Sequence, residues 1–263
     1  MHKLGRALEA GRIGLGLFSV IRDPNVIELL GCLGYDFVVI DMEHSALDLP
    51  GAENLIRAAQ LHAMAALVRT PRGDLATVAR VLDAGADGVM IPHVSTPQQA
   101  AEVVAAAKYH PVGTRGVDDA NRAARFGTVP MAEHMRAQNA KNLVIAMIED
   151  GGAVQRIDEI LAVKGLDALV MGTADLAADL GVPNEMDHPS VVAAKRRVFE
   201  RALAVGLPVG MSAWGDEAVA KAATMGARLI TVPDLDMLFL SSVLGGALSA
   251  ARRVLGGGAE HGE

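Results

Sequence analysis

Two carboxylates in the second half of the chain have a spacing that suits a divalent cation. Glu149 ends one apolar run, and Asp175 follows the next one, after an intervening helix-like stretch. If both runs are parallel strands, the two side chains project from neighbouring strand ends toward one point. Carboxylates held that close repel each other, and Mg2+ or Mn2+ relieves the repulsion while taking other ligands from water and substrate. The alternative is that Glu149 caps the next helix and Asp175 lies in a turn.

An arginine and a histidine follow other apolar runs and could act on a bound substrate. Arg69 ends AALVR, where it could stabilise an oxyanion or form a salt bridge to a nearby carboxylate. His44 lies three residues after Asp41, whose carboxylate could orient the ring and raise its basicity. A single histidine in a loop is often merely solvated, and His93, which follows another apolar run, is the main rival for this role.

The other polar residues argue against several alternative chemistries. The histidines show neither H-x-x-H nor H-E-x-x-H spacing, which disfavours zinc. The predicted loops after the seventh and eighth strands read SAWGDEA and VPDLDM, which disfavours phosphate groups and flavin. A Schiff-base aldolase needs a lysine at a strand end. The lysines fall on predicted helices, at the N-terminus or ahead of strands: Lys3, Lys108, Lys141, Lys164, Lys195 and Lys221.

The elements that must position these residues form a repeating strand–helix pattern. Ala-rich segments with a period of about 3.6 residues, such as NLIRAAQLHA, separate the short apolar runs. Strict alternation predicts a parallel α/β sheet, and eight units favour a closed (β/α)8 TIM barrel over an open sheet. A Rossmann-like sheet is the alternative, but no run is followed by G-x-G-x-x-G. The predicted strands are Ile13–Phe18, Asp36–Asp41, Ala65–Arg69, Gly88–Pro92, Leu143–Glu149, Ala168–Gly172, Pro208–Ser212 and Arg228–Val232.

No internal boundary divides this pattern. We expect one barrel domain over residues 1–255 and a frayed tail over residues 256–263. One connection is unusually long: the region from Pro111 to Pro130, between the fourth and fifth predicted strands, which includes PVGTRGV and NRAARFG. Loops of that length inside a compact domain are usually functional.

Composition bounds the class of protein. Apolar residues make up 51% of the chain but aromatics only 3%, so a large core must be built from Ala, Val, Leu, Ile and Met. The net charge of -7 argues against a nucleic-acid surface. Cys32 is the one cysteine, which excludes an intrachain disulfide, and the N-terminus lacks a signal-peptide pattern. We expect a cytoplasmic protein without a membrane span.

The rim residues and their neighbours resemble the HpcH/HpaI family of class II, metal-dependent pyruvate aldolases. This family acts on 2-keto-3-deoxy and 4-hydroxy-2-oxo acids, and its barrel is of the phosphoenolpyruvate/pyruvate-superfamily type. The resemblance covers nearly the whole chain, and the order and spacing of its segments are specific. The segments are VVIDMEHS, ALVRTP, GVMIPHV, HPVGTRGV, RFG, AMIED and VMGTADLAADLG.

The resemblance implies how the pyruvate unit is held. Glu149 and Asp175 would ligate Mg2+, Mn2+ or Co2+, and the metal would chelate the carboxylate and keto oxygens of pyruvate. Backbone N–H groups of Ala174 and Asp175 would hold the substrate carboxylate. Arg69 would neutralise the enolate oxygen that retro-aldol cleavage leaves, so that no lysine imine is needed.

The resemblance also implies a base for the C4 hydroxyl proton. His44 would take this role, directly or through a metal-bound water, with Asp41 in support. In the family an aspartate at the position of Asp83 increases the basicity of the histidine. The predicted strands put Asp83 ahead of the fourth strand, away from the rim, so a neighbouring subunit would have to supply it.

Three positions depart from the family pattern. Met147 stands where the family usually has Gln, two residues before the metal glutamate, and strand alternation points it the same way as Glu149. A polar contact to substrate or metal water is therefore lost. The other two departures are GTAD in place of GPAD and DMEH in place of DGEH. We expect the metal and enolate chemistry to survive, with a changed substrate choice or rate.

We therefore expect a lyase that reversibly cleaves a hydroxylated 2-oxo acid to pyruvate and an aldehyde. One alternative is a CoA-thioester lyase of the citramalyl- or malyl-CoA type, although an acidic rim with few lysines suits CoA phosphates poorly. Another is a non-catalytic barrel that binds a keto acid or scaffolds an oligomer, a view that Met147 favours.

Relatives in this family typically exchange the eighth helix between subunits, often as hexamers built as trimers of dimers. The resemblance therefore implies a homo-oligomer. The apolar segment LFLSSVLGGALSAARRVL suits such an exchange, and it could equally pack on its own barrel.

Overall fold

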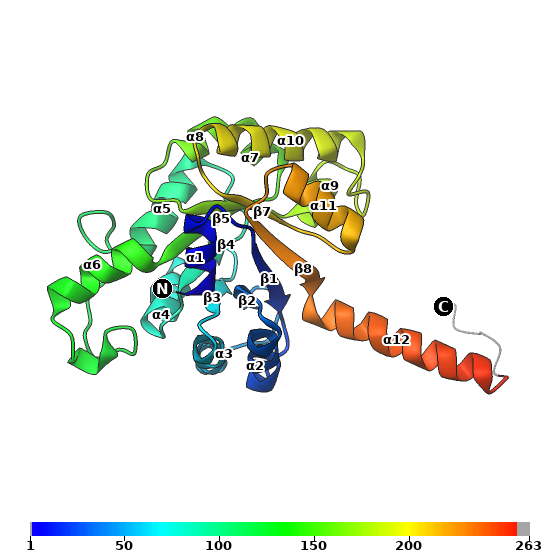
Figure 1. The fold of residues 1–263 in the computed structure, drawn as a ribbon. Coiled ribbons are helices and arrows are strands. Elements are labelled where there is room, and N and C mark those ends of the chain that lie inside the picture. Colours follow the sequence, from blue (N-terminus) through cyan, green and yellow to red (C-terminus); the bar gives the residue numbers. More distant parts are fainter. Residues whose placement is uncertain (1, 257–263) are drawn as a thin grey trace.

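The apolar runs form eight parallel strands that close into a barrel in the computed structural model, which describes residues 2–256. Each strand pairs with the next along the chain, and β8 pairs with β1 (Figure 1). The predicted (β/α)8 barrel is confirmed, with every strand end within three residues of its predicted position. The strands are β1 (Gly14–Ser19), β2 (Phe37–Asp41), β3 (Ala65–Arg69), β4 (Gly88–Ile91), β5 (Leu143–Ile148), β6 (Ala168–Met171), β7 (Val209–Ser212) and β8 (Leu229–Leu235).

Helices follow the strands and cover much of the outside of the barrel (Figure 1). Several begin at the predicted signals; for example, Asp23 caps the helix that starts with Pro24. The helices are α1 (Lys3–Glu9), α2 (Pro24–Leu33), α3 (Leu49–Leu61), α4 (Leu75–Asp83), α5 (Pro97–Ala107), the 3-10 helix η1 (Arg125–Gly127), α6 (Met131–Lys141), α7 (Gly151–Gln155), α8 (Ile157–Leu161), α9 (Thr173–Asp179), α10 (Pro189–Ala204), α11 (Asp216–Thr224) and α12 (Asp236–Val254).

The barrel interior is filled by side chains that alternate along the strands with those facing the helices. Phe37 and Val39 of β2 and Leu67 of β3 belong to this interior cluster, together with Leu4 of α1. A Cβ added to Gly16 would lie 2.3 Å from the ring of Phe37, so β1 needs a glycine beside this ring. Large side chains thus close the N-terminal part of the interior, despite the scarcity of aromatics.

The long connection predicted between the fourth and fifth strands lies between α5 and β5 and contains η1. It contacts the end of α4: Arg122 donates to the carbonyl of Ala84 at 3.1 Å, and the N–H of Ala123 donates to the carbonyl of Asp83 at 3.0 Å. The C-terminal end of a barrel helix lies beside the N-terminal ends of the strands. Within one chain, this connection is therefore remote from the strand ends that carry the predicted site.

The last helix, α12, extends away from the barrel (Figure 1). Its first residue, Asp236, is buried and accepts hydrogen bonds from the hydroxyl of Ser19 at 2.6 Å and from the N–H groups of Val20 and Ile21 at 3.2 Å. Packing of this segment on its own barrel, one of the two predicted outcomes, is not found. Its exposed apolar residues include Met237, Leu238, Phe239, Leu240, Val243, Leu244 and Leu248.

Two further predictions concern the ends and the hydropathy of the chain. Of the tail predicted over residues 256–263, only residue 256 is described; the others lie outside the described residues. Among residues 2–256, no helix combines the length and the apolar character that crossing a membrane requires.

Candidate active site

A cavity of about 590 Å³ opens at the carboxyl ends of the strands. Its walls include Arg69 at the end of β3, Glu149 just after β5, and Ala174 and Asp175 in α9. Met147 also lines it, two residues before Glu149. The volume lies in the range of about 300–1,000 Å³ that is typical of small-molecule sites. The strand ends thus bring the predicted cation ligands, guanidinium and carboxylate-binding amides to one cavity.

Glu149 is held in a buried position beside the backbone of β6. Only 2% of its surface is exposed, and a Cβ added to Gly172 would lie 2.2 Å from its Oε1, so the carboxylate lies directly against residue 172. Burial raises the pKa of Glu149; contacts with His93 oppose this, and the charges of Asp175 and Glu43 add to it. A nearby positive charge would stabilise the ionised form of such a carboxylate.

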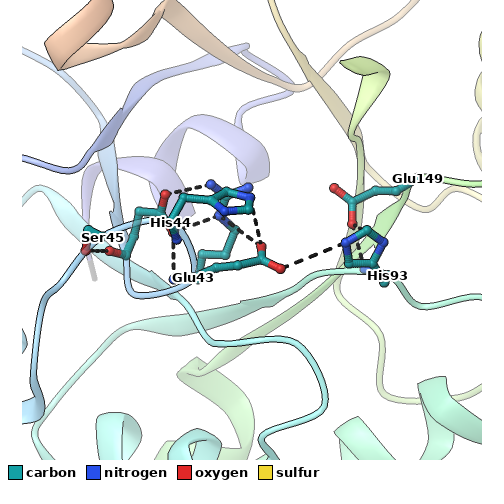
Figure 2. Close-up of polar contacts among 7 residues, drawn as sticks. Glu43, His44, Ser45, His93 and Glu149 are labelled. Atoms are coloured by element: carbon teal, nitrogen blue, oxygen red, sulfur yellow. Dashed lines mark hydrogen bonds and ion pairs between the residues drawn. The ribbon is translucent and has the colours of Figure 1, made fainter. Parts of the chain in front are cut away.

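His93 approaches Glu149 through both its backbone and its ring. Its N–H donates to Oε2 of Glu149 at 2.6 Å, and its Nδ1 lies 3.5 Å from the same oxygen (Figure 2). His93 has a φ of 54°, in the left-handed region that residues other than glycine seldom adopt. This turn after β4 points the N–H at the carboxylate. Strained backbone of this kind is concentrated at functional sites.

Ala174 and Asp175 lie in the first turn of α9, which begins directly after Gly172. The N–H groups of a first turn have no acceptor within their own helix, and the helix dipole favours an anion there. No side chain caps this helix. The arrangement therefore leaves backbone donors facing the cavity beside the Asp175 carboxylate.

Arg69 forms a bidentate hydrogen-bonded ion pair with Asp41. Its Nε donates to Oδ1 of Asp41 at 3.0 Å and its Nη2 donates to Oδ2 at 2.6 Å, while its guanidinium lies 4.8 Å from the ring centre of Phe18. Burial alone would lower the pKa of Arg69, but the hydrogen bonds and charge of Asp41, with the charges of Glu43 and Glu149, raise it. Arg69 is therefore a permanent, oriented cation in the cavity wall.

Asp41 contacts the main chain of the following loop and not the imidazole of His44. Its Oδ1 accepts the N–H of Glu43 at 2.9 Å and the N–H of His44 at 3.2 Å. Asp41 was predicted to orient the ring of His44, but the contact found is with the backbone N–H of His44. Asp41, which is wholly buried, sets the path of the loop and the direction of Arg69.

Glu43 is a site residue that the sequence reasoning did not single out. Its carboxylate lies between three basic groups: Oε2 is 3.6 Å from Nε of Arg69 and 3.8 Å from Nε2 of His44, and Oε1 is 3.9 Å from Nε2 of His93 (Figure 2). Burial raises its pKa, against the charges of Arg69 and the two histidines. The signal was present in the sequence, since Glu43 is part of the DMEH run after β2.

The two candidate bases differ in exposure. The side chain of His44 is 60% exposed, whereas that of His93 is 20% exposed and lies between Glu43 and Glu149. His44 is therefore largely exposed to solvent, and neither histidine is among the described residues that line the cavity. His93 is the histidine closer to the predicted metal ligand.

Asp83 is not brought to this site within the chain. It is the last residue of α4 and forms an ion pair with Arg115, whose guanidinium is fully buried and lies 4.6 Å from the ring centre of Tyr109. The expectation that Asp83 lies away from His44 in its own barrel agrees with this position.

The donor set suits a hard divalent cation. Glu149 and Asp175 offer carboxylate oxygens to one cavity, and burial, with the charges of Asp175 and Glu43 adding to it, raises the pKa of Glu149. Within residues 2–256, no group of three or more His, Cys, Asp or Glu side chains forms a complete metal site. Water and substrate oxygens would fill the remaining positions, as is common for Mg2+.

Two lysines line the cavity although they lie on helices. Lys195 of α10 and Lys221 of α11 face the same space as Glu149 and Asp175. Both positions agree with the prediction that these lysines lie on helices, and neither of them was predicted to act in the site. Neither follows a barrel strand directly, so the absence of a strand-end lysine still holds for the described residues.

Comparison with known proteins agrees with this geometry. Residues 14–232 match the sequence model of the HpcH/HpaI aldolase/citrate lyase family. The chain is 35% identical over 231 residues to a hydroxypyruvate/pyruvate aldolase of Sagittula stellata, which covers 88% of this chain and 90% of the relative. It is 36% identical over 238 residues to a 5-keto-4-deoxy-D-glucarate aldolase of Salmonella newport, covering 86% and 92%. The crystal structure of an HpcH/HpaI aldolase from Desulfitobacterium hafniense superposes with a TM-score of 0.89 at 32% identity, covering 96% of this chain and 97% of the other.

Proposed function

We propose that this chain reversibly cleaves a hydroxylated 2-oxo acid to pyruvate and an aldehyde. The chain belongs to the HpcH/HpaI aldolase/citrate lyase family and is a carbon–carbon lyase. One observation carries this proposal: buried Glu149, Asp175 and the fixed guanidinium of Arg69 share a single cavity. The aldolase names of the two relatives favour it over a CoA-thioester lyase and over a non-catalytic barrel.

The pyruvate unit would be held by groups on both sides of the cavity. Glu149 and Asp175 would bind Mg2+, Mn2+ or Co2+, and the bound cation supplies positive charge beside the keto group of the substrate. The N–H groups of Ala174 and Asp175 would donate to the substrate carboxylate. Arg69, held by Asp41, would donate to the keto oxygen as it becomes an enolate oxygen.

The cleavage step needs one base and one protonation. His44 would take the proton of the C4 hydroxyl group, with Asp83 of a neighbouring subunit raising its basicity; His93 is the second candidate. The C3–C4 bond then breaks, the aldehyde leaves, and the electron pair stays on the pyruvate fragment as an enolate. A proton added at C3 completes pyruvate. The reverse order of events describes the synthesis direction.

The assembly proposed for this enzyme is a homo-oligomer in the cytoplasm, a hexamer built as a trimer of dimers. The exposed apolar residues of α12 support association of subunits, because a helix of this length seldom leaves such a surface in water. A second copy of the chain would cover α12 and would place its Asp83 near the site.

Exchange of the methyl protons of pyruvate with D2O tests the donor half of the reaction without any aldehyde. We expect rapid exchange with Mn2+ or Mg2+, loss of exchange in EDTA, and recovery when the metal is restored. Arg69→Ala should abolish exchange because the enolate loses its fixed cation. Arg72→Ala is the matched control, since Arg72 is exposed three residues further along the chain.

Two outcomes would count against this mechanism. Exchange that persists undiminished in EDTA would exclude the metal role of Glu149 and Asp175. Irreversible inactivation by borohydride in the presence of pyruvate would reveal an imine on a lysine, which an enzyme of this type does not form.

A further inference from the structure

A second cavity, of about 560 Å³, lies at the opposite end of the barrel from the active site. Its walls include Met64, just before β3, and Asp87, just before β4, so it opens at the N-terminal ends of the strands. The N-terminus, the residues after α4, the connection before β5 and helix α6 meet there (Figure 1). None of the described residues that line it lines the active-site cavity, and the proposed mechanism does not use it.

Positive charge collects on the wall of this cavity, although the chain as a whole has a net charge of -7. Arg122, Arg125 and Lys141 line it, and among the described residues Asp87 is the one carboxylate there. Asp87 is 2% exposed and already has partners: Nζ of Lys141 lies 2.7 Å from its Oδ1, and its Oδ2 accepts the N–H of Ala66 at 3.1 Å. The lining carboxylate is therefore taken by the lysine, and the two arginines remain in excess.

Arg122 is fixed in this wall by neutral acceptors. Its Nη1 donates to the carbonyl of Ala84 at 3.1 Å, and its Nη2 donates to Oε1 of Gln60 at 2.6 Å. A Cβ added to Gly85 would lie 2.3 Å from Nη1, so the guanidinium packs directly against the chain that follows α4. These contacts hold the group in place without a carboxylate.

The charge of Arg122 is compensated only in part. Burial and the charge of Arg57 lower its pKa, against the charges of Glu53 and Asp87. The C-terminal end of a helix such as α4 carries about half of one negative elementary charge. Part of the positive charge of Arg122 is thus left for a ligand.

Arg125 and the residue after it have an unusual backbone. Their φ values are 51° and 54°, in the left-handed region that residues other than glycine seldom adopt. Both Arg125 and Phe126 line the cavity. The side chain of Arg125 has no hydrogen bond or ion pair within residues 2–256. Strained backbone is concentrated at functional sites, and here it brings an unpaired guanidinium to the cavity.

His2 adds a buried donor to the same wall. It is 9% exposed, and its Nδ1 accepts the N–H of Gly5 at 3.0 Å, which caps α1. Burial lowers the pKa of His2, against the charge of Asp87, so the ring is neutral at neutral pH. In a neutral ring whose Nδ1 accepts a hydrogen bond, Nε2 carries the proton. Over the described part of the chain, no acceptor bonds to this N–H.

We propose that this cavity binds a phosphate group, either as inorganic phosphate or as a phosphate monoester. The donors of Arg122, Arg125, His2 and Lys141 come from separate segments of the chain. A tetrahedral dianion accepts hydrogen bonds from several directions, whereas a carboxylate is planar and has two oxygens. Guanidinium groups match phosphate oxygens in geometry and charge. The bound group would hold the N-terminus, the connection before β5 and α6 together, whatever reaction the active site performs.

Calorimetric titration of the metal-free protein tests this inference. The probes are inorganic phosphate, methyl phosphate and acetate at equal ionic strength. We expect both phosphates to bind at one site per chain, at least about tenfold more tightly than acetate, because a dianion makes more charge-assisted hydrogen bonds. A further gain for methyl phosphate over inorganic phosphate would identify a monoester as the ligand.

Arg125→Asn is the decisive variant. It removes an exposed guanidinium that has no partner in the described protein, and asparagine tolerates the left-handed backbone of this position. We expect it to weaken phosphate binding by about ten- to a hundredfold, the range for one hydrogen bond to a charged group. Arg72→Asn is the matched control, since Arg72 is exposed and lies outside the cavity. It should leave the affinity unchanged.

Hydrogen–deuterium exchange locates the bound anion. Phosphate should slow exchange over residues 121–128 in the wild type and not in Arg125→Asn. Arg69→Ala should bind phosphate as the wild type does, because Arg69 lines the other cavity.

Three results would overturn the inference. If Arg69→Ala loses the affinity while Arg125→Asn keeps it, the anion binds in the active-site cavity. A wild type that binds acetate as tightly as phosphate has no phosphate site, and neither has one that gives no heat with either phosphate and no protection over residues 121–128.

Discussion

Arg69 and Asp41 form two hydrogen bonds between guanidinium and carboxylate, at the ends of adjacent strands β3 and β2. Asp41 is wholly buried, and its Oδ1 also accepts the N–H groups of Glu43 and His44. Neither group of the pair can rotate without breaking several hydrogen bonds. Arg69 is thereby pre-oriented toward the cavity before substrate arrives, which is the condition for electrostatic stabilisation of an enolate.

Arg69→Lys tests whether orientation matters beyond charge. Lysine keeps the positive charge but cannot form the two parallel hydrogen bonds to Asp41. We expect pyruvate proton exchange to fall by about 10²–10³-fold, the loss typical of a misplaced oxyanion donor. Exchange is followed by NMR with saturating Mn2+, and Arg72→Lys serves as the control. Near-normal exchange would mean that charge alone suffices.

Gly172→Ala tests the packing of Glu149. The added Cβ would lie 2.2 Å from Oε1 and 2.5 Å from Cγ of Glu149, so the carboxylate has to move. We expect Mn2+ affinity, measured by electron paramagnetic resonance, to fall at least about tenfold with the fold retained, as for other perturbed ligand shells. Gly116→Ala is a matched control, because its Cβ meets no atom within 4 Å. Unchanged affinity would exclude Glu149 as a tightly positioned ligand.

Lys195→Met should stabilise the protein at neutral pH. The pKa of Lys195 is lowered in the folded state, so below that pKa both states are protonated and the folded state carries the full cost of burying the charge. As pH rises from the lowered pKa toward the ordinary value of 10.5, the unfolded state binds more protons and the wild type regains this stability. We expect the variant to be about 1–3 kcal/mol more stable at pH 7.

Urea unfolding of both proteins, at one protein concentration, measures this difference from pH 7 to pH 10.5. Groups common to the two proteins cancel in the comparison. If the difference in free energy of unfolding stays constant from pH 7 to pH 10.5, or if the variant is less stable at pH 7, burial of the Lys195 ammonium does not destabilise the folded protein.

Subunit mixing tests whether Asp83 acts on His44 of another copy. Within one chain Asp83 pairs with Arg115 at the opposite end of the barrel from His44. His44→Ala and Asp83→Asn should each be nearly inactive in retro-aldol cleavage. After dissociation and reassembly of a 1:1 mixture, about a quarter of sites should regain both residues if each site is shared across a twofold interface.

Recovery of activity would require both an oligomer and a shared site. Full activity of Asp83→Asn alone would remove Asp83 from the mechanism. As a control, His44→Ala is mixed 1:1 with Lys164→Met, whose residues His44 and Asp83 are both intact. This mixture gives the activity expected when the partner chain already carries intact sites.

The sequence predicted the barrel and much of the site because both depend on local patterns. Strand ends are marked by the point at which an apolar run meets its first charges, and in a parallel barrel all such points lie on one rim. Glu149, Asp175 and Arg69 could therefore be placed in one cavity without coordinates. The same reasoning placed Asp83 at the other end, because it precedes its strand.

Contacts between side chains of different elements could not be predicted in this way. The carboxylate of Asp41 was expected near the His44 ring, three residues away, but it binds the guanidinium of the adjacent strand, and alternation alone does not choose between them. Lys195 was missed because its helix looked ordinary in composition. Only its position among the apolar residues of α10 carried a signal, and the depth of the cavity beneath α10 depends on tertiary packing.

The anchoring of Asp236 links the far end of the molecule to the cavity. This carboxylate joins the start of α12 to the end of β1, and the two residues before it, Asp234 and Leu235, form part of the cavity wall. The start of α12 and this part of the cavity wall are therefore consecutive in the chain, and both lie beside the hydrogen bonds of Asp236. In the homo-oligomer proposed above, contacts of α12 with a neighbouring copy would therefore bear on the position of this part of the cavity wall.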